Sequence, residues 1–178
     1  RSAVVTVTSH NPGTVPAQNL TLSGNGFGAE LTLVAPAGGA LVFGAVTVGT
    51  PAQLPVTLRN DGNADLTVSS ITFSRPEYTL QSPLPTINPA QQGTVNVQCL
   101  PTARGPVPAA TMTINNNSYN QPARVINLSC SGQNGELRTN PVTVDFGNLA
   151  FGMMATRTFL LENIGELPVT INTGASVI

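Results

Sequence analysis

The chain has 178 residues, a net charge of −1 and 8% charged residues, against a usual share of about 25%. No basic run occurs, since lysine is absent and the seven arginines are scattered, so the sequence indicates no nucleic-acid partner. No apolar stretch approaches the roughly 18 residues of a membrane-spanning helix, so no membrane span is expected either.

The first segment, residues 1–30, has the pattern of two short strands. It opens with AVVTVT at 3–8, and its end, LTLSGNGFGAEL at 20–31, resembles INLSCSGQNGEL at 126–137, at an offset of 106 positions. The glycines of 24–28 resemble part of a nucleotide-binding loop, but no helix pattern follows, so a turn between units is favoured. We predict that residues 1–30 are the closing strands of a preceding unit.

The middle segment, residues 31–132, carries short strand patterns separated by turns of Gly, Asn and Pro. Alternating apolar residues mark the strands: Val46 and Val48, Val56 and Leu58, Leu66 and Val68, Val95, Val97 and Cys99, Met112 and Ile114, and Ile126, Leu128 and Cys130. Fifteen prolines and the lack of an apolar 3.6-residue period argue against helices. Short strands at this spacing predict an all-β, immunoglobulin-like β-sandwich.

The last segment, residues 133–178, repeats the start of the middle one. The stretch LVFGAVTVG at 41–49 recurs as VDFGNLAFG at 144–152, 103 positions later. This offset aligns Phe43, Gly44, Gly49, Asn60 and Gly62 with Phe146, Gly147, Gly152, Asn163 and Gly165. We predict a tandem immunoglobulin-like repeat in which 31–132 is one complete unit and 133–178 are the opening strands of the next.

These ten aligned residues are predicted to serve structure and turns. Asn60 and Asn163 are expected to hydrogen-bond nearby backbone, and Gly62 and Gly165 to supply a positive φ. The stretch DGNAD at 61–65 also resembles the start of a calcium loop, but the required Gly and Glu are missing and 164–168 lacks the pattern, so a turn is favoured.

Taken together, these motifs resemble the ASH (Hydin-type) family and its bacterial relatives known as choice-of-anchor D modules. The resemblance rests on FGAVTVG at 43–49, LRNDG at 58–62, LTV at 66–68, VNVQCLPT at 95–102 and INLSCSG at 126–132. It implies a seven-strand immunoglobulin-like sandwich related to major-sperm-protein domains. Bacterial members of this kind occur in tandem in large exported proteins, and eukaryotic members occur in ciliary and centrosomal proteins.

Cys99 and Cys130 are the two cysteines, and they depart from the family pattern, which has an aromatic residue and a glycine there. Each continues an apolar alternation, so both are expected to point into the core. A disulfide between them closes a loop of about thirty residues, worth roughly 3–4 kcal/mol. The alternative is a pair of buried free thiols.

Catalysis has little support in the sequence. His10 is the sole histidine and lies in a turn, and the eight acidic residues form no paired constellation. We therefore predict no enzyme activity, no cofactor and no metal site.

The expected function is a structural spacer in an exported protein, such as a stalk, a filament or a surface layer. The first alternative is an adhesive module that binds a protein or glycan through its loops; the second is a cytoplasmic scaffold, which the lysine-free composition disfavours. Neighbouring repeats are the expected partners. Unpaired strand edges also allow self-association by strand addition, although truncation of a longer repeat protein explains the partial units more simply.

Overall fold

The structure, a computed structural model, describes residues 2–8 and 17–172. Within these ranges the regular elements are strands, apart from one 3-10 turn, η1 (Ala37–Gly39), so the all-β prediction is confirmed. The strands are β1 (Ser2–Val7), β2 (Gln18–Ser23), β3 (Leu31–Ala35), β4 (Ala40–Thr47), β5 (Ala52–Asn60), β6 (Leu66–Phe73), β7 (Tyr78–Leu80), β8 (Thr86–Ile87), β9 (Gln92–Cys99), β10 (Gly105–Pro106), β11 (Ala110–Asn116), β12 (Ala123–Gln133), β13 (Leu137–Asn140) and β14 (Leu160–Asn163).

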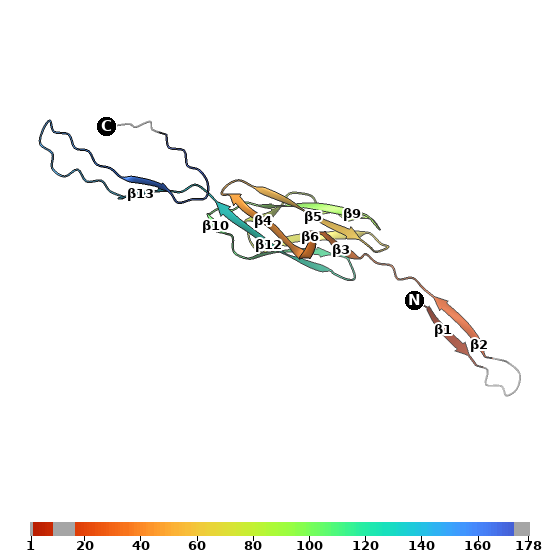
Figure 1. Cartoon of the computed structure of the whole chain (residues 1–178). Coiled ribbons are helices and arrows are strands. Elements are labelled where there is room, and N and C mark those ends of the chain that lie inside the picture. Colours follow the sequence, from red (N-terminus) through yellow and green to blue (C-terminus); the bar gives the residue numbers. More distant parts are fainter. Residues whose placement is uncertain (1, 9–16, 173–178) are drawn as a thin grey trace.

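Strands β3 to β12 form a sandwich of two sheets at the centre of an elongated chain (Figure 1). One sheet has the order β3-β5-β9-β7, and the other has the order β4-β12-β11-β6-β8 with β10 also paired to β12. Strand β4 runs parallel to β12. Because η1 lies between β3 and β4, the chain enters in one sheet and crosses to the other at 36–39.

The core is made by the inward side of the strand alternations. Val56 and Leu58 of β5 are fully buried, as are Val95 and Val97 of the neighbouring strand β9, and Val56 lies opposite Val95. The second sheet supplies the other side of this core: Leu66, Val68, Met112, Ile114, Ile126 and Leu128 are all buried. The two-residue period of a strand places these side chains on one face of each sheet, as the sequence pattern predicts.

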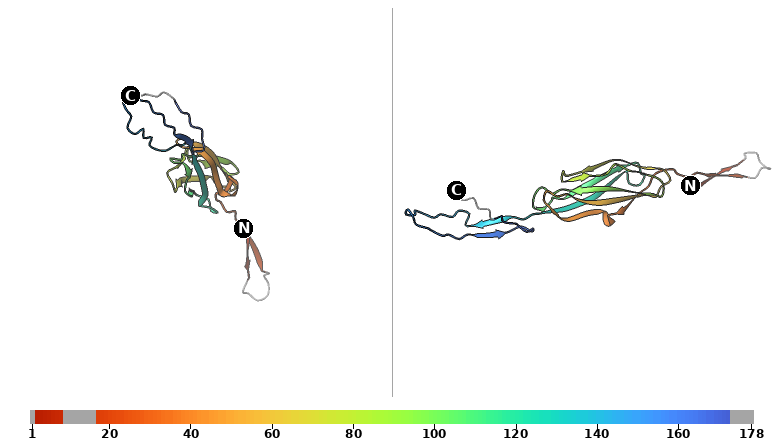
Figure 2. Two further views of the ribbon diagram at one scale, coloured as in Figure 1. Left: turned by 60° about the vertical axis from the view of Figure 1, so that its left-hand side comes forward. Right: turned by 90° about the horizontal axis from the view of Figure 1, so that it is seen from above.

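The N-terminal strands form a separate antiparallel hairpin, β1–β2, at one end of the sandwich (Figures 1 and 2). Val5 lies opposite Leu20, as Met112 lies opposite Ile126 in the β11–β12 pair. The hairpin therefore has the pairing of the closing strands of the sandwich, but its apolar residues are exposed.

The C-terminal segment lies at the opposite end of the sandwich (Figure 2). Its strands β13 and β14 pair with Leu137 opposite Asn163, and β3 and β5 pair with Leu31 opposite Asn60. Both ends thus reproduce local strand pairings of the central sandwich, and at the C-terminal end the register is the one that the repeat offsets give. No helix in the described residues is long and apolar enough to cross a membrane.

Candidate functional site

The candidate site is the pair of junctions at the two ends of the sandwich, where one set of polar contacts occurs twice. At the first junction, the chain leaves β2 and enters β3 through residues 24–30. The side chain of Asn60, at the end of β5, fixes this entry. Its amide oxygen accepts hydrogen bonds from the backbone N–H of Glu30 at 3.2 Å and of Gly62 at 3.0 Å.

The amide nitrogen of Asn60 completes the contact. It donates to the carbonyl oxygens of Ala64 at 2.8 Å and Ile87 at 2.9 Å. Asn60 is fully buried, so its amide satisfies backbone groups that would otherwise lack partners away from water. The side chain joins the entering linker, the turn after β5 and the strand β8.

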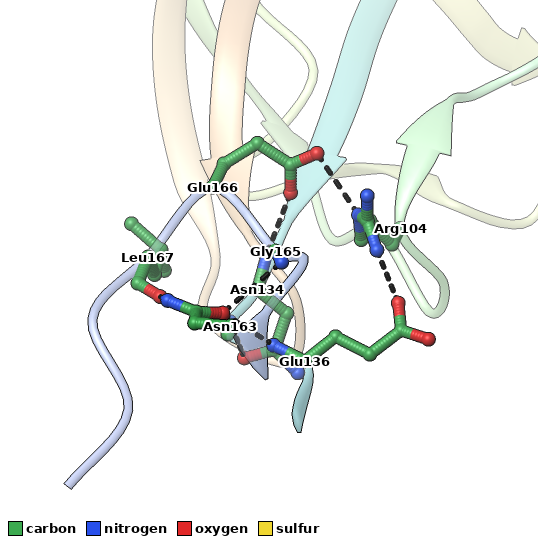
Figure 3. A network of polar contacts seen from close by, with 8 residues as sticks. Arg104, Asn134, Glu136, Asn163, Gly165, Glu166 and Leu167 are labelled. Carbon is green, nitrogen blue, oxygen red and sulfur yellow. Dashed lines mark hydrogen bonds and ion pairs between the residues drawn. The ribbon is translucent and has the colours of Figure 1, made fainter. Parts of the chain in front are cut away.

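The second junction repeats this arrangement (Figure 3). The oxygen of Asn163 accepts from the N–H of Glu136 at 3.2 Å and of Gly165 at 3.0 Å, and its nitrogen donates to the carbonyl of Leu167 at 2.8 Å. The backbone hydrogen bonds of the linkers also match. The N–H of Asp61 donates to the carbonyl oxygen of Glu30 at 2.9 Å, and the N–H of Ile164 donates to the carbonyl oxygen of Glu136 at 2.8 Å.

Gly62 and Gly165 serve this junction in a different way from the one the sequence suggested. The prediction of a positive φ is wrong, because neither glycine is among the residues with that conformation. A Cβ atom at Gly62 would overlap the carbonyl oxygen of Gly28, and one at Gly165 would overlap that of Asn134. The glycines therefore allow the entering linker to pass directly against the turn.

The other aligned glycines do lie in the left-handed region. Gly44 and Gly49 have φ of 70° and 76°, and Gly147 and Gly152 have φ of 62° and 81°. Phe43 packs on the buried Tyr78 with ring centroids 6.0 Å apart, whereas Phe146 is exposed. Burial raises the pKa of Tyr78.

Cys99 and Cys130 form a disulfide in the structure. Cys99 ends β9 in one sheet and Cys130 lies in β12 of the other, so the bond joins the two sheets across the core. Both residues are buried, at 0% and 5% exposure.

The second junction also carries a network of charges, which Figure 3 shows from close by. Arg104, in the loop between β9 and β10, forms ion pairs with Glu136 and Glu166 beyond the end of the sandwich. The contact from its Nε to Glu166 measures 2.9 Å. The hydrogen bond with Arg104 holds the pKa of Glu166 below its usual value, and the bond with Glu166 raises the pKa of Arg104.

The first junction has an open pocket of about 570 Å³. It is lined by Gly26, Phe27, Gly28, Glu30, Asp61, Gly62, Asn63 and Tyr119. Phe27 and Tyr119 are exposed aromatic residues. A hydrogen bond to the carboxylate of Glu30 raises the pKa of the Tyr119 phenol.

Neither this pocket nor the charge network was predicted from the sequence. The offset of 106 aligns Glu30 with Glu136, which is the signal that could have located both. Asp61, considered above as a calcium ligand, pairs with Arg59 at 2.5 Å. The described residues contain no group of three or more His, Cys, Asp or Glu side chains that could hold a metal. His10 lies outside the described residues.

Comparisons with known proteins support the fold. No family model and no curated protein sequence matches the chain. A crystal structure of a protein of unknown function from Porphyromonas gingivalis W83 aligns with a TM-score of 0.52 and 18% identity, over 74% of this chain and 64% of that one. The chain thus spans less than two thirds of that relative.

A second solved structure is the ASH/PapD-like domain of human CEP192, PapD-like domain 7. It aligns with a TM-score of 0.51 and 12% identity, over 73% of this chain and 99% of the domain. At this identity the likeness concerns the fold. It confirms the prediction of an all-β, immunoglobulin-like sandwich with an ASH-type fold.

Proposed function

We propose that the chain is a non-catalytic structural repeat of an exported protein, a spacer in a stalk, filament or surface layer. In this proposal residues 31–132 are one complete unit. Residues 1–30 are the closing strands of the unit before it, and residues 133–178 are the opening strands of the unit after it, as in tandem choice-of-anchor D modules. The partners are then neighbouring repeats of the same protein.

The observation that carries the proposal is the duplicated junction. The amide oxygens of Asn60 and Asn163 accept from equivalent backbone N–H groups, and Gly62 and Gly165 receive equivalent linkers. Two copies of one junction in one chain support a row of units joined end to end. A row with such tight linkers keeps a set spacing between its ends, which is the task of a spacer.

The disulfide supports export, because such bonds persist in oxidising compartments and are rare in the cytosol. The test is fractionation of the source cells with an antibody against 31–132, followed by intact mass before and after reduction. We expect an extracellular or cell-surface pool whose mass rises by two protons on reduction. A purely cytoplasmic pool with free thiols would overturn the export proposal and favour the cytoplasmic scaffold instead.

The second candidate function is an adhesive module. The observation in its favour is the pocket at the first junction, where the exposed Phe27 and Tyr119 lie beside Glu30. Exposed aromatic residues are frequent anchors in binding sites. Screening the intact chain against glycans and extracellular proteins, with Tyr119→Ala as the matched variant, tests this function. Binding that this variant abolishes would favour adhesion over a spacer role.

Self-association is the remaining proposal from the sequence. The β1–β2 hairpin exposes Val5, Leu20 and Leu22, and the C-terminal segment exposes Phe159 and Leu161. In a longer protein, the missing strands of each partial unit cover these residues. Light scattering of the 178-residue chain at high concentration tests the alternative: a strict monomer rules out strand-exchange polymers.

A further inference from the structure

The two junctions differ in what lies against them from the preceding unit. At the second junction, the loop 101–104 of the sandwich packs on the end of β12, just before the linker to the next unit. The carbonyl oxygen of Ala103 lies so close to Gly132 that a Cβ atom there would overlap it. The neighbouring Arg104 reaches across to Glu136 and Glu166. The loop 101–104 thus covers the end of β12 with its backbone and holds the following unit with the guanidinium group of Arg104.

The first junction presents the same surface. The offset of 106 aligns Gly26 with Gly132 and Glu30 with Glu136, and the offset of 103 aligns Asn63 with Glu166. Asn63 also takes over a contact of Glu166: its oxygen accepts from the N–H of Gly28 at 2.9 Å, as the carboxylate of Glu166 accepts from Asn134 at 3.5 Å.

At the first junction, nothing in the described residues covers Gly26 in the way that Ala103 covers Gly132 at the second junction. The ideal Cβ position at Gly26 has no atom within 4 Å. Phe27, which aligns with Gln133, is 82% exposed. The carbonyl oxygen of Gln133 accepts a 3.0 Å hydrogen bond from the backbone N–H of Val48, a residue of the sandwich. At the second junction, therefore, the unit before the linker covers the position that Phe27 occupies at the first.

We propose that the pocket at the first junction binds the arginine-bearing loop of a preceding immunoglobulin-like unit, with its guanidinium on Glu30 and its backbone over Gly26. This inference rests on the proposed tandem arrangement and names the partner surface. The loop that corresponds to 101–104 in such a unit is not among the 178 residues.

The charges of the pocket fit a guanidinium. Glu30 and Asp61 line it, and Asp61 already pairs with Arg59. The carboxylate of Glu30 accepts a hydrogen bond from the Tyr119 phenol and makes no ion pair in the described residues, so it can still accept a cation. The rings of Phe27 and Tyr119 flank the pocket, and a guanidinium stacks on aromatic faces while it bonds a carboxylate. Because Asn63 stands where Glu166 stands, the arginine has one carboxylate partner here and two at the second junction.

The test uses an extended chain in which the strands missing from the preceding unit are added at the N-terminus. Residues 31–109 are placed directly before Ala3, because Ala3 and Ala110 hold equivalent places opposite Leu22 and Leu128. In the added copy, Cys99 is changed to valine, since Gly24 stands where its partner Cys130 would be. The reactivity of each arginine toward a dicarbonyl reagent is then followed by peptide mass spectrometry, in which this valine marks the added copy.

We expect the Arg104 of the added copy to be protected to within about threefold of the native Arg104, and both to be protected relative to Arg157. Glu30→Gln should release the added Arg104 alone, and the matched control, Glu136→Gln combined with Glu166→Gln, should release the native Arg104 alone. Equal reactivity of the added Arg104 and Arg157, unchanged by Glu30→Gln, would overturn the inference.

A second variant tests the backbone contact. Gly26→Ala should leave the 178-residue chain unchanged, because its Cβ meets no atom there, and should expose the added Arg104 in the extended chain. If the extended chain does not fold, the acetylated peptide PTARGP is titrated into the 178-residue chain at millimolar concentration. Shifts of the Gly28 and Tyr119 NMR signals that an alanine-for-arginine peptide does not cause support the inference, and their absence overturns it.

These outcomes are separate from those of the proposed function. A secreted, disulfide-bonded chain whose added arginine stays reactive keeps the spacer role and loses this contact. A cytoplasmic chain with a protected arginine keeps the contact and loses the exported role.

Discussion

The central sandwich and the segments at its two ends are built from the same strand patterns, but the two regions differ in burial. Leu58 in β5 is fully buried, whereas its counterpart Leu161 in β14 is 38% exposed. Ile126 in β12 is fully buried, whereas Leu20 in β2 is 58% exposed. The strand pairs themselves have equivalent registers in both regions. Strand pairing is therefore local, whereas burial requires the opposite sheet, without which a two-stranded ribbon is only marginally stable.

Removal of the disulfide should change the difference in stability between the sandwich and the end segments more than any other variant proposed below. Changing Cys99 and Cys130 to alanine removes a link across 31 residues, and the chain-entropy model gives a loss of about 4 kcal/mol in unfolding free energy. The loss should fall on the sandwich alone, because the end segments contain no cysteine. Urea unfolding with NMR detection measures both regions at once; an unchanged sandwich midpoint would contradict the expectation.

A matched pair of leucines tests burial directly. Leu58→Ala should lower the unfolding free energy by about 3 kcal/mol, through lost apolar burial and the cavity left behind. Leu161→Ala should change it by no more than about 0.5 kcal/mol in the 178-residue chain, since the side chain is largely at the surface. Equal effects on thermal unfolding of the two variants would show that the C-terminal segment has a packed core of its own.

The junction asparagines should differ for the same reason. Asn60→Ala leaves several buried backbone groups without partners and should cost about 2 kcal/mol, whereas Asn163→Ala should cost less than about 0.5 kcal/mol because water reaches that junction. Asn60→Asp serves as the control, since it keeps the accepting oxygen and loses the bonds to Ala64 and Ile87. Calorimetry of the three variants gives the comparison.

The smallest effect concerns pH at the second junction. The pKa of Glu166 is lowered from 4.5 in the folded chain by its hydrogen bond with Arg104, so its stabilising contact is fully present above pH 4.5. It is lost as the pH falls below 4.5 through the folded pKa. The Nε–H signal of Arg104 should shift in that window in the wild type, and the Glu166→Gln variant should lack the part of the shift that Glu166 causes.

The fold and part of the site could be predicted from the sequence. Alternation placed Val56, Leu58, Val95 and Val97 in the core because strand periodicity depends only on neighbours in sequence. The repeat offsets aligned Asn60 with Asn163 and indicated a common role. The role of Gly62 was predicted wrongly. In the sequence, a glycine that supplies a positive φ cannot be told from one that allows a close backbone approach, and the approach of the linker at Gly28 is visible only in the fold.

The contact of Arg104 with Glu136 and Glu166 was missed for a related reason. These residues lie up to 62 positions apart, and scattered charges in a low-charge chain gave no local pattern. The pairing depends on how one unit meets the next, which the strand alternation does not describe. Phe27 and Tyr119 are likewise far apart in sequence and meet at the first junction only through the fold.

The disulfide has a mechanical consequence. In the proposed spacer role the chain would bear tension along its length, and a unit that unfolds under tension lengthens by about 3.5 Å for each residue released. The bond between Cys99 and Cys130, which are 31 positions apart, keeps the chain between them out of that extension and shortens the released length by about 110 Å. Oxidation of these two thiols therefore limits how far each unit can stretch, and reduction restores the full reach.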